Sequence, residues 1–396
     1  MLTVYLDTSD FSYFAKVRQG KGKPEHEVIL ESLLNFKNTG LVEFRYSFVH
    51  MAEFLNTNKD DLKGNLEKGK ILEELCEGKV FEFITSIWEA EIVAGINLDK
   101  SFLADKVYSD DGCWFPEKEG KDKLEKIITE GKEILKNETS LNRKERRTKL
   151  AELRKLDERE MYADGLKRGL VKDRIMKKVL ERYINKDIEK KEIIPDLMNK
   201  ATKPSVLLDE NQYSALLRDT FSKIVTHLGI NFSELLEELK NSLPAINTQK
   251  EKRFFKNQAQ EFKFRLTKEF LIKIHTVINK NKFKKNKDGV TQLDLENLSK
   301  NPNFEFMPSI FAFNLFISSY INKHGLNRET KNKISDGGDA LHCLYAPYSN
   351  IFRADRATCN LISGFEKHFN ILVVDTLESL PTIIEHALNR AKEFES

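Results

Sequence analysis

The sequence predicts an α/β fold in which a mainly parallel sheet is flanked by helices and interrupted by a long all-helical segment. Two observations predict this class. Short apolar runs alternate with helical patterns at both ends of the 396-residue chain, whereas the middle of the chain has helical patterns only. Strands that alternate with helices are joined by crossover connections, which bring neighbouring strands into parallel pairing.

The predicted strands are four short runs that combine apolar and β-branched residues, as buried strands do. They are residues 2–7 (LTVYLD), 41–47 (LVEFRYS), 349–355 (SNIFRAD) and 369–376 (FNILVVDT). Helical patterns separate or follow them, at residues 25–38, 47–56, 339–345 and 379–394. The second of these helices begins at a serine, which is a common helix cap.

From about residue 117 to about residue 302 the chain is rich in lysine and glutamate and keeps the apolar spacing of helices. The pattern is clearest at residues 122–137, 174–191 and 232–243. We therefore expect an α/β domain in two parts, with a basic helical insertion between them. The expected divisions are residues 1–116, 117–302 and 303–396.

Composition places the chain among folded globular proteins, because 40% of the residues are hydrophobic and 32% are charged. The N-terminus lacks the basic and apolar regions of a signal peptide, and no run of about 18 apolar residues occurs. We therefore expect a cytoplasmic protein with no membrane contact.

The four cysteines are scattered and form no CxxC pair, so neither a zinc site nor a disulfide framework is indicated.

Charge is segregated along the chain. Residues 1–120 carry a net charge of −8, whereas residues 121–200 carry +7 and residues 250–290 carry +9. Basic segments with aromatic residues suit a polyanion, and the candidate nucleic-acid contacts are Arg146, Arg147, Lys284 and Lys285. The ordinary alternative is that the phenylalanines belong to a core and the charges to a solvated helix face.

Carboxylates stand at positions from which they can meet at one edge of the sheet. Asp7 and Asp355 end two predicted strands, and Glu53 lies in the helix after the second strand. Asp336 and Asp339 flank two glycines and lie three residues apart on one helix face. Ligands of an open parallel sheet bind beyond the carboxyl ends of its strands. Each of these acids also has an ordinary alternative as a cap, a turn residue or a surface acid.

Clustered carboxylates suit Mg²⁺ or Mn²⁺, because these hard cations take oxygen ligands and relieve the repulsion among the acids. Two such ions about 4 Å apart can drive in-line phosphodiester hydrolysis.

A phosphatase of the DxDxT type is excluded by spacing, since Ser9 occupies the position of the second aspartate. His50 and Glu53 lack a third zinc ligand of matching spacing, and no GxSxG or Walker motif occurs. His342 either faces a phosphate or is a buried, hydrogen-bonded residue.

The segments that contain these acids resemble PIN-domain nucleases, in the order of that family. They are VYLDTSDF at 4–11, SFVHMAEFL at 47–55, SDGGDALHCLYAPYSNIFRADRATCNLI at 335–362 and ILVVDTLESL at 371–380. The resemblance covers about half of the chain. It differs from the usual pattern in its long insertion and in Arg356 and Ala357, which stand where many members have polar or acidic residues.

The resemblance implies a PIN-like sheet and an endoribonuclease dependent on Mg²⁺ or Mn²⁺ that leaves 5′-phosphate and 3′-hydroxyl ends. It places Asp7, Glu53, Asp339 and Asp355 at the four acidic positions, with Asp336 as a neighbouring ligand. RNA is the expected substrate, with a toxin or an anti-phage defence effector as the setting. Three alternatives stay open: a DNA nuclease, a catalytically silent nucleic-acid-binding scaffold, and a nuclease whose insertion docks a regulatory protein partner.

Overall fold

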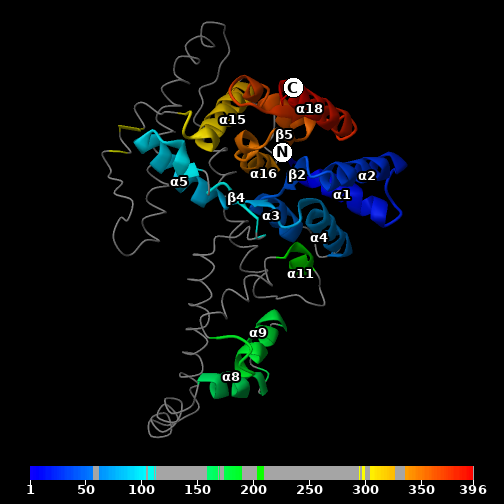
Figure 1. Ribbon diagram of the computed structural model, residues 1–396, viewed down its shortest axis with the longest axis vertical. Coiled ribbons are helices and arrows are strands. Elements are labelled where there is room, and N and C mark those ends of the chain that lie inside the picture. Colours follow the sequence, from blue (N-terminus) through cyan, green and yellow to red (C-terminus); the bar gives the residue numbers. More distant parts are fainter. Residues whose placement is uncertain are drawn as a thin grey trace.

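The computed structural model places the elements of both ends of the chain around one sheet (Figure 1). It describes residues 1–56, 62–103, 106–110, 112, 158–167, 169, 174–189, 203–208, 294, 297–298, 304–325 and 335–395. Within these residues no helix is long and apolar enough to cross a membrane.

The four predicted strands are confirmed, and together they form one parallel sheet in the order β2-β1-β5-β6. Their bounds are β1 (Leu2–Tyr5), β2 (Val42–Arg45), β5 (Ile351–Arg353) and β6 (Leu372–Val374). Strand β1 lies between a neighbour from its own end of the chain and one from the far end. The predicted first and last segments of the chain therefore share one sheet.

A second sheet escaped the sequence analysis. It is an antiparallel pair of two-residue strands, β3 (Val80–Phe81) and β4 (Tyr108–Ser109). An isolated parallel bridge between Tyr46 and Val80 links β3 to the end of β2. Strands of two residues are too short to show an alternating pattern, which is why the sequence does not reveal them.

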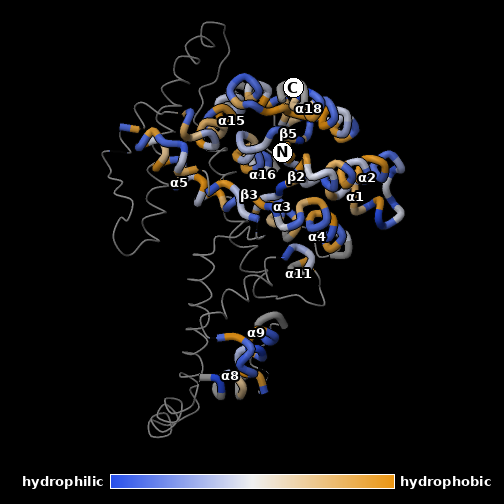
Figure 2. The backbone as a smooth tube through the Cα atoms, in the orientation of Figure 1, coloured by the Kyte–Doolittle hydropathy of each residue, from blue (hydrophilic) through white to orange (hydrophobic). Residues whose placement is uncertain are grey.

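Helices surround the sheet, and Figure 2 shows hydrophobic and hydrophilic residues alternating along them, as amphipathic helices require. The helices of the two ends are α1 (Thr8–Arg18), α2 (Pro24–Asn38), α3 (Phe48–Asn56), α4 (Leu62–Cys76), α5 (Ile84–Asn97), α15 (Pro308–Gly325), α16 (Ser335–Cys343), α17 (Arg356–Leu361) and α18 (Leu380–Glu395). Short 3₁₀ turns are η2 (Lys100–Leu103), η4 (Ala346–Tyr348) and η5 (Phe365–Lys367). The predicted helices at 25–38, 47–56 and 379–394 are confirmed, and the one at 339–345 begins four residues earlier.

The described pieces of the middle are helical, as expected: α8 (Glu158–Lys167), α9 (Arg174–Ile184) and α11 (Pro204–Leu208). Helices α8 and α9 pack on each other, with the Arg159 guanidinium 4.8 Å from the Tyr183 ring centre. In Figure 1 they lie apart from the sheet, whereas α11 lies beside α4. The helices predicted at 122–137 and 232–243 fall outside the described residues.

Helix α11 attaches the middle of the chain to the α/β part. Its Leu208 is buried, and a Cβ atom on Gly69 of α4 would come within 2.8 Å of Leu208 Cδ1. The backbone amide of Ser205 donates a hydrogen bond of 2.8 Å to the Glu73 carboxylate. A glycine at this position of α4 therefore allows the close packing.

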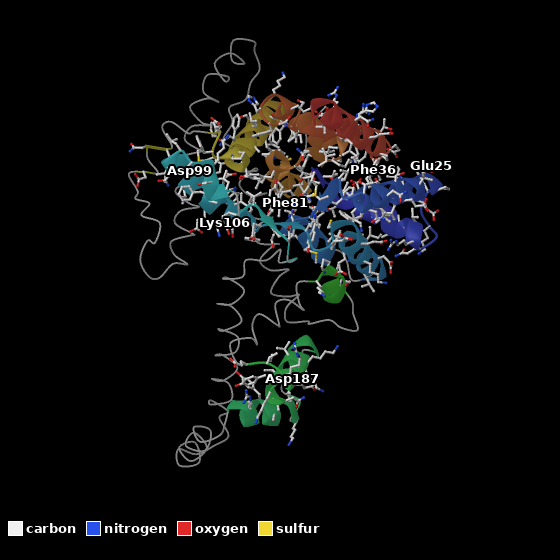
Figure 3. The ribbon with its side chains drawn as sticks, viewed as in Figure 1. Glu25, Phe36, Phe81, Asp99, Lys106 and Asp187 are labelled. Atoms are coloured by element: carbon white, nitrogen blue, oxygen red, sulfur yellow. The ribbon has the colours of Figure 1, made fainter. Side chains whose placement is uncertain are left out.

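A stack of aromatic rings forms the core on one face of the sheet. The Tyr5 ring stacks on Phe352 of the neighbouring strand with centres 5.3 Å apart, and on Tyr345 at 6.0 Å. Phe81, labelled at the centre of Figure 3, lies 5.6 Å from the Tyr5 ring. Because side chains alternate along a strand, Arg353 next to Phe352 points to the opposite face. The two faces therefore carry different chemistry.

A buried polar cluster joins β1, β2 and the β3-β4 pair. Glu43 is 5% exposed and accepts hydrogen bonds from Thr3 (2.8 Å), Arg45 (2.8 Å) and Lys79 (3.0 Å). Arg45 also pairs with Asp110 at 2.9 Å. Burial raises the pKa of Glu43, but the hydrogen bonds of its three partners outweigh burial and lower the pKa to about 2. The cluster is therefore ionised at neutral pH.

This cluster makes stability depend on acid. Because the folded-state pKa of Glu43 is depressed from 4.5 to about 2, its stabilisation is present above pH 4.5 and is lost as the pH falls toward 2. The shift corresponds to about 3 kcal/mol. We expect Glu43→Gln to lower the free energy of unfolding by about that amount at pH 7, and the difference from wild type to shrink by pH 2. Urea unfolding at pH 7 and pH 2 measures the free energy of unfolding of both proteins, with the exposed Glu385→Gln as control. If Glu43→Gln were destabilised equally at both pH values, the prediction would be contradicted.

Candidate active site

The direction of the strand order changes between β1 and β5, and we call the region beyond the carboxyl ends of these two strands the crevice. From β1 the chain proceeds to β2 on one side, and from β5 it proceeds to β6 on the other. The loops that leave the carboxyl ends of β1 and β5 therefore diverge, which is the point where open parallel sheets bind ligands. Asp7 and Asp355 lie in these two loops.

Asp7 and Asp355 have the same local structure. Each is the N-cap of the helix that follows its strand, α1 or α17. Oδ1 of Asp7 accepts a hydrogen bond of 2.7 Å from the Ser9 amide, and Oδ1 of Asp355 accepts one of 2.7 Å from the Thr358 amide. Both acids are therefore helix caps, whereas the ordinary alternative expected for Asp355 was a turn residue. Capping uses one carboxylate oxygen and leaves the second oxygen with lone pairs for a cation.

Glu53 reaches the site from α3, where it meets His342 of α16. Its Oε2 lies 3.5 Å from His342 Nε2, which in turn lies 3.2 Å from Thr8 Oγ1. Burial raises the pKa of Glu53, but His342 and Thr8 outweigh burial and leave the pKa at about 2. Glu53 is therefore an ionised carboxylate with a side chain that is 36% exposed.

The glycine pair at the start of α16 gives Glu53 its room. A Cβ atom on Gly338 would lie 2.6 Å from Glu53 Oε1, which is closer than such atoms approach. Gly338 is half-buried inside the helix, where glycine is otherwise unfavourable by about 1 kcal/mol relative to alanine. The backbone of α16 therefore approaches the Glu53 carboxylate closely at Gly338.

Asp339 shows that the four acids share one electrostatic environment. Burial raises the pKa of its carboxyl and His342 opposes that effect; together with the charges of Asp355, Asp7 and Glu53, the result is a pKa of about 7. Asp336 is the second residue of α16 rather than its cap, and its side chain lies outside what the structure describes.

The chemistry of these side chains fits a hard divalent cation, because carboxylate oxygens are its preferred ligands and Asp339 lies among like charges. Their observed positions fit less well. Among the described residues, no group of three or more His, Cys, Asp or Glu side chains is arranged to hold a metal ion. Convergence on one ion would therefore require side chains to turn.

Asp10 and Arg353 form a support on the other face of the sheet that the sequence analysis missed. Asp10 is fully buried; its Oδ2 accepts a hydrogen bond of 3.1 Å from the Asp7 amide, and its Oδ1 lies 3.0 Å from Arg353 Nη2. Burial raises the pKa of Asp10 to about 7, against the pull of Arg353. Asp10 also completes the capping box of α1, because its side chain accepts a hydrogen bond from the backbone of the cap residue Asp7.

His50 is a structural residue. It is fully buried, its Nδ1 accepts a hydrogen bond of 3.1 Å from the Ser47 amide, and its Nε2 donates one of 2.9 Å to the Leu6 carbonyl. Burial lowers the pKa of His50 to about 3, so the ring is neutral. Both ring nitrogens are engaged, which leaves neither for the zinc ion considered above.

A further acid, Asp375, lies at the end of β6. Asp375, which the sequence analysis did not consider, follows β6 and raises the pKa of the Cys359 thiol, although burial is the larger cause. Its signal was an acid near the carboxyl end of a predicted strand. The candidate nucleic-acid contacts all lie outside the described residues: Arg146, Arg147, Lys284 and Lys285.

Comparisons with protein-family models, with curated proteins and with solved structures find no match to this chain.

The Asp10–Arg353 pair offers a test of how the crevice is supported. Removing Arg353 leaves the buried Asp10 carboxyl group without its charged partner. We therefore expect Arg353→Met to lower the free energy of unfolding by about 3 kcal/mol. The double variant with Asp10→Asn should recover most of that loss, because neither charge remains. Urea unfolding measures both, with Arg390→Met on exposed α18 as control. Equal losses in the single and double variants would show that the charges are not coupled.

Proposed function

We propose that this chain is a metal-dependent endoribonuclease of PIN type, which hydrolyses phosphodiester bonds with Mg²⁺ or Mn²⁺. The observation that supports this best is the environment of Asp339, on which Asp7, Glu53 and Asp355 act together. These acids come from separate segments that the sheet brings to one crevice. A buried carboxyl group that lies near other acids is costly to ionise unless a cation is bound.

In this proposal Asp7, Glu53, Asp339 and Asp355 hold the metal, with Asp336 as a neighbouring ligand. A bound ion would supply an activated water and charge stabilisation for the leaving oxygen. The chain's own residues prepare the site for it. The caps fix Asp7 and Asp355 at the helix starts, and His342 keeps Glu53 ionised. Hydrolysis would leave 5′-phosphate and 3′-hydroxyl ends.

We further propose that the nuclease domain is divided between residues 1–116 and 303–396, with 117–302 as a helical insertion that restricts or positions the substrate. The shared sheet supports this division, since β1 pairs with both β2 and β5. The helical α8, α9 and α11 are consistent with an insertion. Its excess of positive charge suits RNA beside an acidic metal site. A role as toxin or anti-phage effector would fit such an activity.

One observation favours a second candidate, a catalytically silent nucleic-acid-binding scaffold. In the described part of the chain the acids do not form a ready three-ligand group. A silent scaffold would need no such group. Cleavage assays separate the two candidates, and parallel DNA substrates distinguish a ribonuclease from a DNA nuclease.

The decisive experiment incubates the purified full chain with labelled RNA and DNA and either Mn²⁺ or Mg²⁺. We expect RNA cleavage that depends on metal and falls at least about 100-fold in Asp339→Asn, because the metal loses a charged ligand. Asp99→Asn, at an exposed position labelled in Figure 3 and outside the proposed insertion, is the matched control. Cleavage by Asp339→Asn at the wild-type rate would remove this residue from the mechanism. A wild type that binds RNA without cleaving it would favour the scaffold.

A second prediction concerns the room that Gly338 gives to Glu53. Alanine at position 338 would push the Glu53 carboxylate away, because its Cβ would lie 2.6 Å from Oε1. We expect Gly338→Ala to lower cleavage about 10- to 100-fold while the free energy of unfolding does not fall, since alanine favours the helix. Gly364→Ala is the control, because a Cβ there meets nothing within 4 Å. Full activity in Gly338→Ala would mean that the position of Glu53 is unimportant.

A further inference from the structure

A chain of buried polar side chains leads from the core to Glu53. Ser47 Oγ lies 2.7 Å from Tyr5 Oη, and Tyr5 Oη lies 2.6 Å from His342 Nδ1. The other ring nitrogen of His342 faces Thr8 at 3.2 Å and Glu53 at 3.5 Å. Tyr5 is fully buried and the His342 side chain is 6% exposed. The His342 imidazole therefore links the buried Tyr5 hydroxyl on one side to Glu53 on the other.

Packing holds the His342 ring in one orientation. The rings of Tyr5 and His50 meet it edge-on, with centres at 5.6 Å and 4.9 Å. His50 is itself fixed by backbone groups of Ser47 and Leu6. A ring enclosed in this way cannot turn its Nε2 away from Glu53 without disturbing the rings of Tyr5 and His50.

The two buried histidines differ in their partners. His50 satisfies both nitrogens with backbone groups, as a histidine that only fills the core would do. The hydrogen-bond partners of His342 are the hydroxyl groups of Tyr5 and Thr8, and its ion-pair partner is Glu53. An ionised carboxylate only accepts hydrogen bonds, so the nitrogen that faces Glu53 is the one that carries a proton.

We propose that His342 is a positioning residue, which directs an Nε2–H group at Glu53 and thereby holds that carboxylate ready for the metal ion. The proposal rests on the metal-dependent function argued above. Tyr5 and Ser47 extend the effect by fixing Nδ1 on the opposite side of the ring. Supporting residues of this kind typically change metal affinity about 10- to 100-fold when they are replaced.

The first test needs no metal. Long-range ¹⁵N–¹H spectra of the metal-free full chain report which ring nitrogens of His342 carry protons, with the resonance assigned by its loss in His342→Gln. We expect a proton on Nε2, and a change in the His342 ring signals in Glu53→Gln with no change at the exposed His386. The proposal would be overturned if the His342 ring carried a proton on Nδ1 alone, or if its ring signals were the same in Glu53→Gln as in wild type.

The second test measures Mn²⁺ binding by the loss of the free-ion electron paramagnetic resonance signal. We expect His342→Leu to weaken binding about 10- to 100-fold, and His342→Gln to stay within a few-fold of wild type because its amide still donates. His386→Gln is the matched control, and Tyr5→Phe, which keeps the packed ring, serves if His342→Leu fails to fold. Wild-type affinity in folded His342→Leu or Tyr5→Phe would refute the positioning role. If wild type binds no Mn²⁺, the proposed function fails, and the proton location still decides whether His342 directs Glu53.

Discussion

The pairing of β1 with β5 is the constraint on which the rest of the structure depends. It joins residues far apart in the chain: the Thr3 amide donates to the Asn350 side chain, and the Asn350 amide donates to the Thr3 carbonyl, both at 2.8 Å. Once these strands are parallel and adjacent, their carboxyl ends must lie side by side, and the helices after them begin at one crevice. Burial of the aromatic stack around Tyr5 stabilises this pairing, because each ring removes a large apolar area from water.

Residues on the two faces of the sheet hold different acids of the crevice in place, Glu53 on one face and Asp7 on the other. On the face of Tyr5, hydroxyl and imidazole groups form a hydrogen-bonded line that ends at Glu53. On the opposite face, Arg353 neutralises Asp10, which holds the backbone amide of Asp7. A buried ion pair contributes little net stability, because desolvation offsets the attraction. Its value here is geometric, since it fixes the turn from β1 into α1 where Asp7 lies.

Strand positions could be predicted because each strand is a short apolar run, and the acids at strand ends followed from them. Helix α16 shows where such reasoning stops. Its first turn contains two glycines, which local propensity disfavours, yet the helix begins at Ser335 because contacts with α3 and α15 override propensity. Local patterns also could not reveal that Arg353 pairs with Asp10 or that His342 meets Glu53. Those pairings join residues that are close only after the sheet has formed.

Glu53 and Asp339 show how neighbouring side chains decide the charge of a buried carboxyl group. Both carboxyl groups are desolvated at one crevice, yet their pKa values move in opposite directions, to about 2 and about 7. Burial acts alike on both, so the difference comes from their partners. Glu53 has the imidazole of His342 and the hydroxyl of Thr8 against it. The charges of three other acids act on Asp339, and His342 opposes them without preventing the rise in pKa. In the proposed function, a hard cation bound beside Asp339 would supply the positive charge that offsets these acids.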